Sequence, residues 1–351
     1  MTAAGDADGP AAGTADAAGG DADPPDWREE YADFDGDWRR VESPTEETLY
    51  GVVVTAEGPM VSGGDGQVLF RHRGEWVVVL DAGVNAKRDT LFGMDVTDDG
   101  RRVWFAGSSG ALGAYDLVEG RTIDYSAPGE KTSTWEDVAV AGVRGDERVV
   151  AANGSGELLE AEIGDDDAPE WRDVVKAGGG SSIYAVTYGP GDADVSGASD
   201  DSGGRGGDAA VAYAIDTNGK AYARRDDDWV EIGVDGAQTD FADVVGTDGR
   251  LFVVGGDGLA HRYDRGRDNW TPVRVGEADL NAVDAAGDDL TVAADDGRIY
   301  ERAPVVGWRP QATMTEQNLL DVAVSDGLDV AVGAGGVILE RDAAGDATDG
   351  T

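Results

Sequence analysis

Residues 280–297 read LNAVDAAGDDLTVAADDG, and residues 319–336 read LLDVAVSDGLDVAVGAGG. Each stretch starts with a leucine that is followed three positions later by valine, and each ends with a glycine 17 residues after that leucine. The two stretches are 39 residues apart. A pattern that recurs at such an interval is typical of repeat proteins, in which each unit is one supersecondary motif.

The same two anchors occur seven times in the chain. The first anchor is an apolar residue followed three positions later by Val or Met, and it stands at Leu49, Leu91, Trp135, Ile183, Phe241, Leu280 and Leu319. The second anchor is a glycine, at Gly66, Gly110, Gly156, Gly219, Gly258, Gly297 and Gly336. Unit four is lengthened by the segment 189–208 (GPGDADVSGASDDSGGRGGD), whose composition predicts a flexible insertion between the first and second strands of that unit.

Each unit contains four short runs of residues that favour strands. In the first unit these runs are LYGVVVT, MVSGG, QVLFRHR and EWVVVL, separated by turn residues. The repeated glycine precedes the third run, where it fits a turn that needs positive φ. Units of about 40 residues with four strands each indicate propeller blades. The sequence therefore predicts an all-β fold, a seven-bladed β-propeller of four-stranded blades.

The last unit ends at Arg341, before any fourth strand, and the missing strand is found at the other end of the chain. Trp38 stands 11 residues before Leu49, as Trp308 stands 11 residues before Leu319. We therefore expect an N-terminal strand to complete the last blade and close the ring, which removes an exposed sheet edge. The expected organisation is a disordered acidic tail at 1–26, the propeller at 27–341 and a disordered tail at 342–351.

These repeats resemble the WD40/YVTN/BNR-like propeller superfamily over about residues 37–341. Within it, the pattern is most similar to the propellers of photosystem II assembly factors, and Tyr263–Trp270 (YDRGRDNW) resembles a degenerate Asp-box. This superfamily includes scaffolds, assembly factors and glycosidases. The resemblance therefore implies a fold without implying an activity.

The composition excludes several classes of site and partner. The chain has 71 Asp+Glu against 28 Lys+Arg, a net charge of −43, no cysteine and two histidines. Disulfides and thiolate sites are impossible, and a multi-histidine metal centre is not expected, so we predict no metal and no cofactor. A surface this negative repels nucleic acid, and no apolar run is long enough to span a membrane. We expect a cytoplasmic monomer from a halophilic archaeon.

Polar residues recur at the start of the first strand in every unit. The residue before the first anchor is small and polar in all seven units, and the residue two positions after that anchor is aspartate in three of them. In a propeller these positions surround the mouth of the central channel. Their oxygens could cap backbone N–H groups at a tight turn, or they could bind a ligand such as a cation or a basic peptide. The candidate ligand-binding residues are Asp137, Asp243, Asp321, Asp95, Asp284, Asp240, Asp279 and Asn318.

No set of residues in the sequence supplies the nucleophile, base and oxyanion roles of an enzyme. We therefore expect no catalytic residues and a non-catalytic binding or assembly scaffold, whose top face binds another protein or a small ligand in high salt. The alternative is a glycosidase- or lyase-like enzyme that uses two top-face carboxylates as acid and base.

The charge leads to a prediction about salt. Carboxylates on a compact ring repel one another, and molar salt screens that repulsion because the Debye length falls to about 3 Å. We expect the melting temperature to drop when the protein is dialysed from about 1 M to about 0.1 M salt. A melting temperature that stays constant over this range would contradict the interpretation of the charge as an adaptation to salt.

Overall fold

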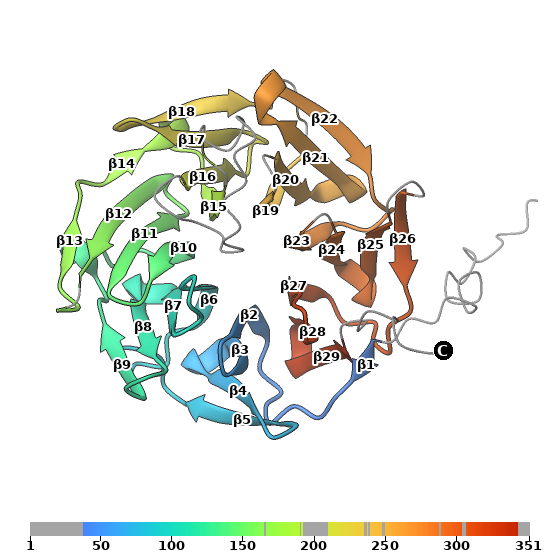
Figure 1. Ribbon diagram of the computed structural model, residues 1–351, viewed down its shortest axis with the longest axis horizontal. Helices are drawn as coiled ribbons and strands as arrows, with labels where there is room; N and C mark the ends of the chain where they lie inside the picture. Colours follow the sequence, from blue (N-terminus) through green and yellow to red (C-terminus); the bar gives the residue numbers. More distant parts are fainter. Residues whose placement is uncertain are drawn as a thin grey trace, which may run out of the picture.

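A computed structural model of the chain describes residues 38–342, apart from residues 165, 190, 192–209, 235, 236, 238, 248, 249, 288 and 304–306. Seven antiparallel sheets follow one another around a ring (Figure 1). The predicted seven-bladed β-propeller is confirmed. The predicted tails at 1–26 and 342–351 and the insertion at 189–208 lie almost entirely outside the described residues.

The strands of each blade run from the axis of the ring to its rim in chain order, except in blade 7, whose outermost strand is β1. Blades 1 to 3 contain β2 (Leu49–Thr55), β3 (Gly58–Gly63), β4 (Val68–His72), β5 (Glu75–Leu80); β6 (Leu91–Val96), β7 (Arg102–Gly107), β8 (Leu112–Asp116), β9 (Arg121–Asp124); and β10 (Trp135–Val143), β11 (Asp146–Asn153), β12 (Glu157–Ile163), β13 (Pro169–Trp171), β14 (Val175–Lys176). Blades 4 and 5 contain β15 (Ile183–Gly189), β16 (Val211–Asp216), β17 (Ala221–Arg225), β18 (Asp228–Gly233); and β19 (Phe241–Thr247), β20 (Arg250–Gly255), β21 (Leu259–Asp264), β22 (Asn269–Arg274). Blades 6 and 7 contain β23 (Leu280–Ala286), β24 (Asp289–Ala294), β25 (Ile299–Ala303), β26 (Gly307–Gln311); and β27 (Leu319–Ala323), β28 (Leu328–Gly333), β29 (Val337–Asp342), β1 (Arg39–Arg40).

The helices of the described residues are short 3₁₀ turns, none of which has the length and apolar character of a membrane-spanning helix. They are η1 (Gly64–Gly66), η2 (Ser108–Gly110), η3 (Pro128–Glu130), η4 (Ala177–Gly179), η6 (Gly256–Gly258), η7 (Arg265–Arg267), η8 (Asp295–Gly297) and η9 (Ala334–Gly336).

The repeated glycine ends the turn before the third strand of each blade. All seven of these glycines have positive φ, between 66° and 76°, as the sequence predicts. At Gly336 a Cβ atom would also lie 2.1 Å from the backbone oxygen of Thr45, which leads into the next blade. Both the left-handed conformation and this close approach therefore require glycine.

The core is divided into layers, because each sheet buries side chains against the next. Separate clusters of buried apolar residues lie between each pair of neighbouring blades, including the pair formed by blades 7 and 1. The two interfaces of blades 6/7 and 7/1 illustrate this. Trp38 packs with Leu319 and Leu339 on one side of blade 7, and Leu49 packs with Ile338 on its other side. Stability therefore depends on an unbroken circle of interfaces.

An ion-pair network that the sequence did not reveal joins blades 2 and 3. Arg102, which is 1% exposed, lies 2.9 Å from Asp116 in its own blade and 2.8 Å from Glu147 of β11. Burial raises the pKa of Glu147 to about 7, although Arg102 opposes this shift. The network is structural, since all three side chains are shielded from solvent.

The ring is closed by the N-terminal strand, as the spacing of the tryptophans predicts. The short strand β1 pairs with β29 through Arg39–Glu340 and Arg40–Leu339. Trp38, which is 2% exposed, lies beneath the guanidinium group of Arg341 at 4.8 Å. Blade 7 is thus assembled from both ends of the chain (Figure 1).

This closure gives a prediction for truncated chains. Removing residues 1–42 deletes Trp38 and β1, and it should lower the free energy of unfolding by about 3–5 kcal/mol or more, because a buried tryptophan and a strand pairing are both lost. Denaturant titration in molar salt measures the loss. Removing residues 1–26 leaves both features in place and serves as the control. Equal unfolding midpoints for the two truncations would contradict closure by β1.

Candidate functional site

The innermost strand of every blade begins with a β-bulge. In blade 3 the pairing shifts between Trp135 and Asp137, so that Glu136 has no partner on β11. The same shift occurs at the first anchor of the six other blades. A bulge turns the side chain of its extra residue away from the regular alternation of the strand. Seven such residues therefore lie around the axis at the face where the chain enters the inner strands, here called the upper face.

Five of the predicted site residues connect neighbouring blades. The carboxylate of each accepts a hydrogen bond from a backbone N–H of the innermost strand of the next blade. Asp321 accepts from Val52 at 2.7 Å, and Asp137 accepts from Val186 at 2.9 Å. The three other bonds are Asp95 to Val140, Asp243 to Val283 and Asp284 to Val324, at 2.8–2.9 Å.

Four of these carboxylates, all except Asp284, also accept a bond from the N–H of the residue that follows them. Each thereby satisfies two backbone donors that have no partner in a β-ladder. The five aspartates lie on or next to the inner strands, and their hydrogen bonds join neighbouring blades.

Burial changes the acidity of two of the five. Desolvation raises the pKa of Asp137 and of Asp321 well above the usual range. The N–H groups of Val186 and Val52 oppose this shift, whereas the nearby Asp243 adds to it in both cases. The carboxylates therefore repel one another electrostatically across the axis. Proton uptake by one of them relieves its repulsion with the others.

The small polar residues before the anchors lie on the upper face. The Asp279 carboxylate accepts from the N–H of Asp257 at 2.8 Å, and the Asn318 side chain accepts from the N–H of Asp296 at 3.2 Å. Both bonds reach a turn of the preceding blade. Asp240 binds through its backbone, because its carbonyl oxygen accepts from Gly256 at 3.1 Å. The side chains of Asp279 and Asn318 thus cap backbone N–H groups, whereas the bond of Asp240 is one of backbone to backbone.

A group of bulge residues was missed by the sequence analysis. These residues, called here the axial cluster, come from blades 1 to 4 and are Tyr50, Phe92, Glu136 and Tyr184. Tyr50 packs edge-to-face against Phe92, with ring centroids 5.0 Å apart. Tyr184 is 49% exposed, which is unusual for an aromatic side chain on an inner strand. The corresponding residues of blades 5 to 7 are Ala242, Asn281 and Leu320.

The axial cluster combines aromatic rings with one carboxylate. Glu136 has no hydrogen bond or ion pair with any described residue, and partial burial raises its pKa. Burial also raises the pKa of Tyr184, and the nearby Glu136, Asp137 and Tyr50 strengthen that effect. The exposed ring of Tyr184 therefore lies in a negative field on the upper face.

The alternation of residues in a regular strand concealed the cluster. In such a strand positions one and three face the same way, and this pattern singles out the aspartates at position three. The bulge brings position two to the axis, and its residues share neither charge nor size. No group of three or more metal-ligating side chains that could hold an ion occurs among the residues that the structure describes.

The chain matches no protein-family model, and no curated protein matches its sequence. Solved structures do match its fold. A catalytically inactive virginiamycin B lyase from Staphylococcus aureus, crystallised with quinupristin, superposes with a TM-score of 0.67 at 14% identity, covering 87% of this chain and 98% of the lyase chain. A chain of the mitotic checkpoint complex superposes with a TM-score of 0.66 at 10% identity, covering 88% and 95%. The similarity is one of fold.

The raised pKa of Asp321 predicts how one substitution changes the dependence of stability on pH. A carboxyl with a raised pKa in the folded state stabilises the fold most below its unfolded pKa of about 3.9, and this contribution is lost as the pH rises through the folded value. Asp321→Asn removes the titrating group and keeps an acceptor oxygen. The stability of the native sequence should therefore increase relative to that of the variant as the pH falls from 7 towards 5.

Denaturant midpoints of both proteins at several pH values, in constant molar salt, measure this difference. Asp326→Asn on the exposed β27–β28 connection serves as the matched control. A difference between Asp321→Asn and the native sequence that stays constant over the pH range would contradict the assignment.

Proposed function

We propose that the protein is a non-catalytic binding scaffold, and that the axial cluster on its upper face holds a cationic side chain of a partner protein. The observation that carries this proposal is the half-exposed ring of Tyr184 beside the unpaired carboxylate of Glu136. A propeller presents such a site on a rigid platform of inner strands, so a partner finds it already formed.

The chemistry of the cluster favours an organic cation. An aromatic ring attracts a cation over its face, and a neighbouring carboxylate can pair with the same charge. The Tyr50–Phe92 pair adds apolar surface for the aliphatic part of an arginine or lysine side chain. Cation–π contacts and apolar contacts persist when salt screens long-range attraction, which suits a protein that works in concentrated salt.

The inner aspartates strengthen the preference for a cation. Asp137 and Asp243 are among the groups near Tyr184 that add to the rise in its pKa caused by burial, so a negative charge on either of them reaches the cluster. An anionic ligand would meet this potential with no described arginine or lysine in the cluster itself. The proposed partner therefore presents a basic residue to the upper face.

The same aspartates support a binding role over the enzymatic alternative. An acid–base pair in a glycosidase or lyase must be free to exchange protons with a substrate. Each of the five inner carboxylates instead accepts at least one backbone bond across a blade interface. Using two of them in catalysis would disturb the connections between blades.

We further propose that the surface acidity is an adaptation to high salt in a halophilic archaeon, and that the scaffold takes part in assembly, as propellers of photosystem II assembly factors do. The net charge of −43 and the repeat pattern support these two points.

The test is affinity capture of proteins from a lysate of the source cells in molar salt, with tagged native protein and two single variants. Tyr184→Ala removes the exposed ring, and Glu136→Gln removes the charge while keeping the shape. We expect a partner that the native protein retains to be captured roughly tenfold less by each variant, since a cation–π contact or a shielded ion pair contributes about 1–2 kcal/mol.

Val118→Ala provides the matched control, because Val118 is 62% exposed and lies between β8 and β9, away from the axis. This variant should capture as much partner as the native protein. Capture of the same proteins at the same level by all variants would overturn the proposed site.

A further inference from the structure

A three-residue clamp is repeated at the outer part of three blade interfaces. A glutamate on the third strand of one blade accepts hydrogen bonds from an arginine and from a tryptophan Nε1 of the next blade. At the 7/1 interface, Glu340 binds Arg71 at 2.7 Å and Trp76 at 2.9 Å. The two other clamps are Glu160 with Arg224 and Trp229, and Glu301 with Arg341 and Trp38.

The interface between blades 4 and 5 keeps the tryptophan and lacks the rest of the clamp. Counted from the repeated glycine, Ala223 stands where the three clamped interfaces have glutamate, and Tyr263 stands where they have arginine. Trp270 Nε1 donates instead to the backbone oxygen of Ile232 at 2.7 Å, and its ring packs on Tyr263 at 4.8 Å. This interface also lacks an inner aspartate bridge, because Ala185 occupies the position of Asp137.

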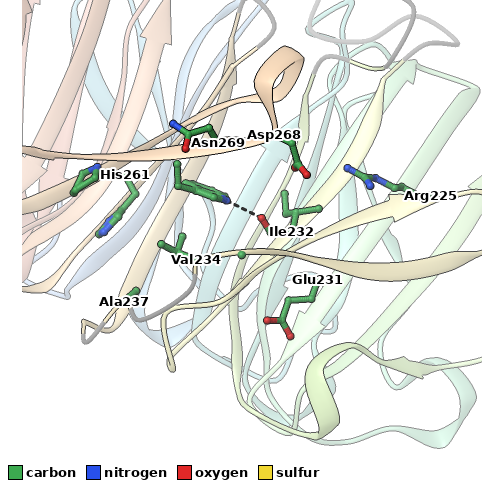
Figure 2. Close-up of a pocket in the computed structure, with 11 residues that line it drawn as sticks. Arg225, Glu231, Ile232, Val234, Ala237, His261, Asp268 and Asn269 are labelled. Carbon is green, nitrogen blue, oxygen red and sulfur yellow. Dashed lines mark hydrogen bonds between the residues drawn. The ribbon is translucent and has the colours of Figure 1, made fainter.

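A cavity of about 670 Å³ lies at this interface, between β18 and β22 (Figure 2). Its walls include the ring of Trp270 and the apolar side chains of Ile232, Val234 and Pro272. The volume falls in the usual range for sites that bind small molecules, about 300–1,000 Å³. The cavity is therefore large enough to hold a small molecule that consists of one aromatic ring and a short polar side chain.

Two polar side chains of the cavity have unused bonding capacity. His261 is 5% exposed, and its Nδ1 has no hydrogen-bond partner among the described residues. Burial lowers its pKa, so the imidazole is neutral. Arg225 has no hydrogen bond or ion pair within the described part of the chain, although acidic residues far outnumber basic ones. His261 is buried, and a buried polar group without a partner costs free energy that a ligand can recover. Arg225 is exposed, and its charge is open to a ligand.

The charges at the cavity are of both signs. Arg225 and His261 lie at opposite ends of the row of lining side chains in Figure 2, and Glu231 and Asp268 lie between them. Asp268 accepts from the hydroxyl of Tyr263 at 2.6 Å and retains a second oxygen, and Glu231 pairs with Lys220. Arg225 and the second oxygen of Asp268, beside an apolar wall, match the two charges of a zwitterion that carries a ring.

We propose that this cavity binds an aromatic amino acid with a polar ring substituent, of which tyrosine is the simplest example. The carboxylate pairs with Arg225, the ammonium group with Asp268, and the ring lies against Trp270 with its substituent towards His261. Arg225 provides two parallel donors for a carboxylate, and an indole ring offers a flat apolar surface for another ring. The site is distinct from the axial cluster, so this proposal does not depend on the proposed scaffold function.

The two histidines of the chain allow a direct measurement. Protein labelled with ¹³C at histidine Cε1 gives one signal from buried His261 and one from exposed His72. Titration with L-tyrosine in molar salt should shift the His261 signal saturably and leave the His72 signal unchanged. No saturable shift of His261, or an equal shift of both signals, would overturn the proposal.

Tyramine, which lacks the carboxylate, and the Arg225→Gln variant test the charge pairing. Arg225 is exposed, so its replacement should leave the fold intact. Each change alone should weaken binding roughly tenfold, the size expected for a charge-assisted hydrogen bond. Tyramine should bind the variant no more weakly than it binds the native protein, because both changes remove the same interaction. Additive losses would show that the carboxylate does not meet Arg225.

Discussion

The whole ring depends on how the innermost strands satisfy their backbone N–H groups. A propeller places seven strands around an axis without pairing any of them to its neighbour across the blade interface, so N–H groups at the inner edge need other acceptors. In this protein the acceptors are aspartates of the preceding blade at five of the seven interfaces. The same bonds hold the upper face in one shape, and the axial cluster depends on that shape.

The two interfaces without an aspartate bridge differ in what replaces it. At the 1/2 interface, Gly51 leaves room for Met94, which lies so close that a Cβ atom would meet its side chain at 2.8 Å. At the 4/5 interface, Ala185 adds an apolar side chain within a small cluster. Both interfaces also lack the outer clamp, with Phe70 and Tyr115 at the clamp positions of the 1/2 interface and Ala223 and Tyr263 at those of the 4/5 interface. The 4/5 interface carries the cavity lined by Trp270 and His261. At the 4/5 interface, the departures from the repeat coincide with this cavity.

The fold could be predicted because the relevant signals lie within one repeat unit. The glycine before each third strand recurs once per unit and predicts seven blades. Trp38 matches the tryptophan of the outermost strands and predicts the closure by β1. The site was harder to predict, because its geometry depends on bulges and on pairs of residues from different units. The aspartates at 137, 243 and 321 can be assigned to the inner strands from the repeat alone, whereas the bulges that bring Glu136 and Tyr184 to the axis leave no mark in the repeat. Arg102 was equally hidden, since its acidic partner Glu147 is 45 residues away.

The two-residue pairing of β1 with β29 has a consequence for biosynthesis. Strand β1 leaves the ribosome before the other strands of the ring, but its partner β29 lies about 300 positions later. Six blades can begin to stack before the seventh exists, and the nascent ring stays open with an unpaired edge on β29 until the two ends meet. Contacts so distant in sequence form slowly, so this protein has a long interval in which chaperones could bind the open ring.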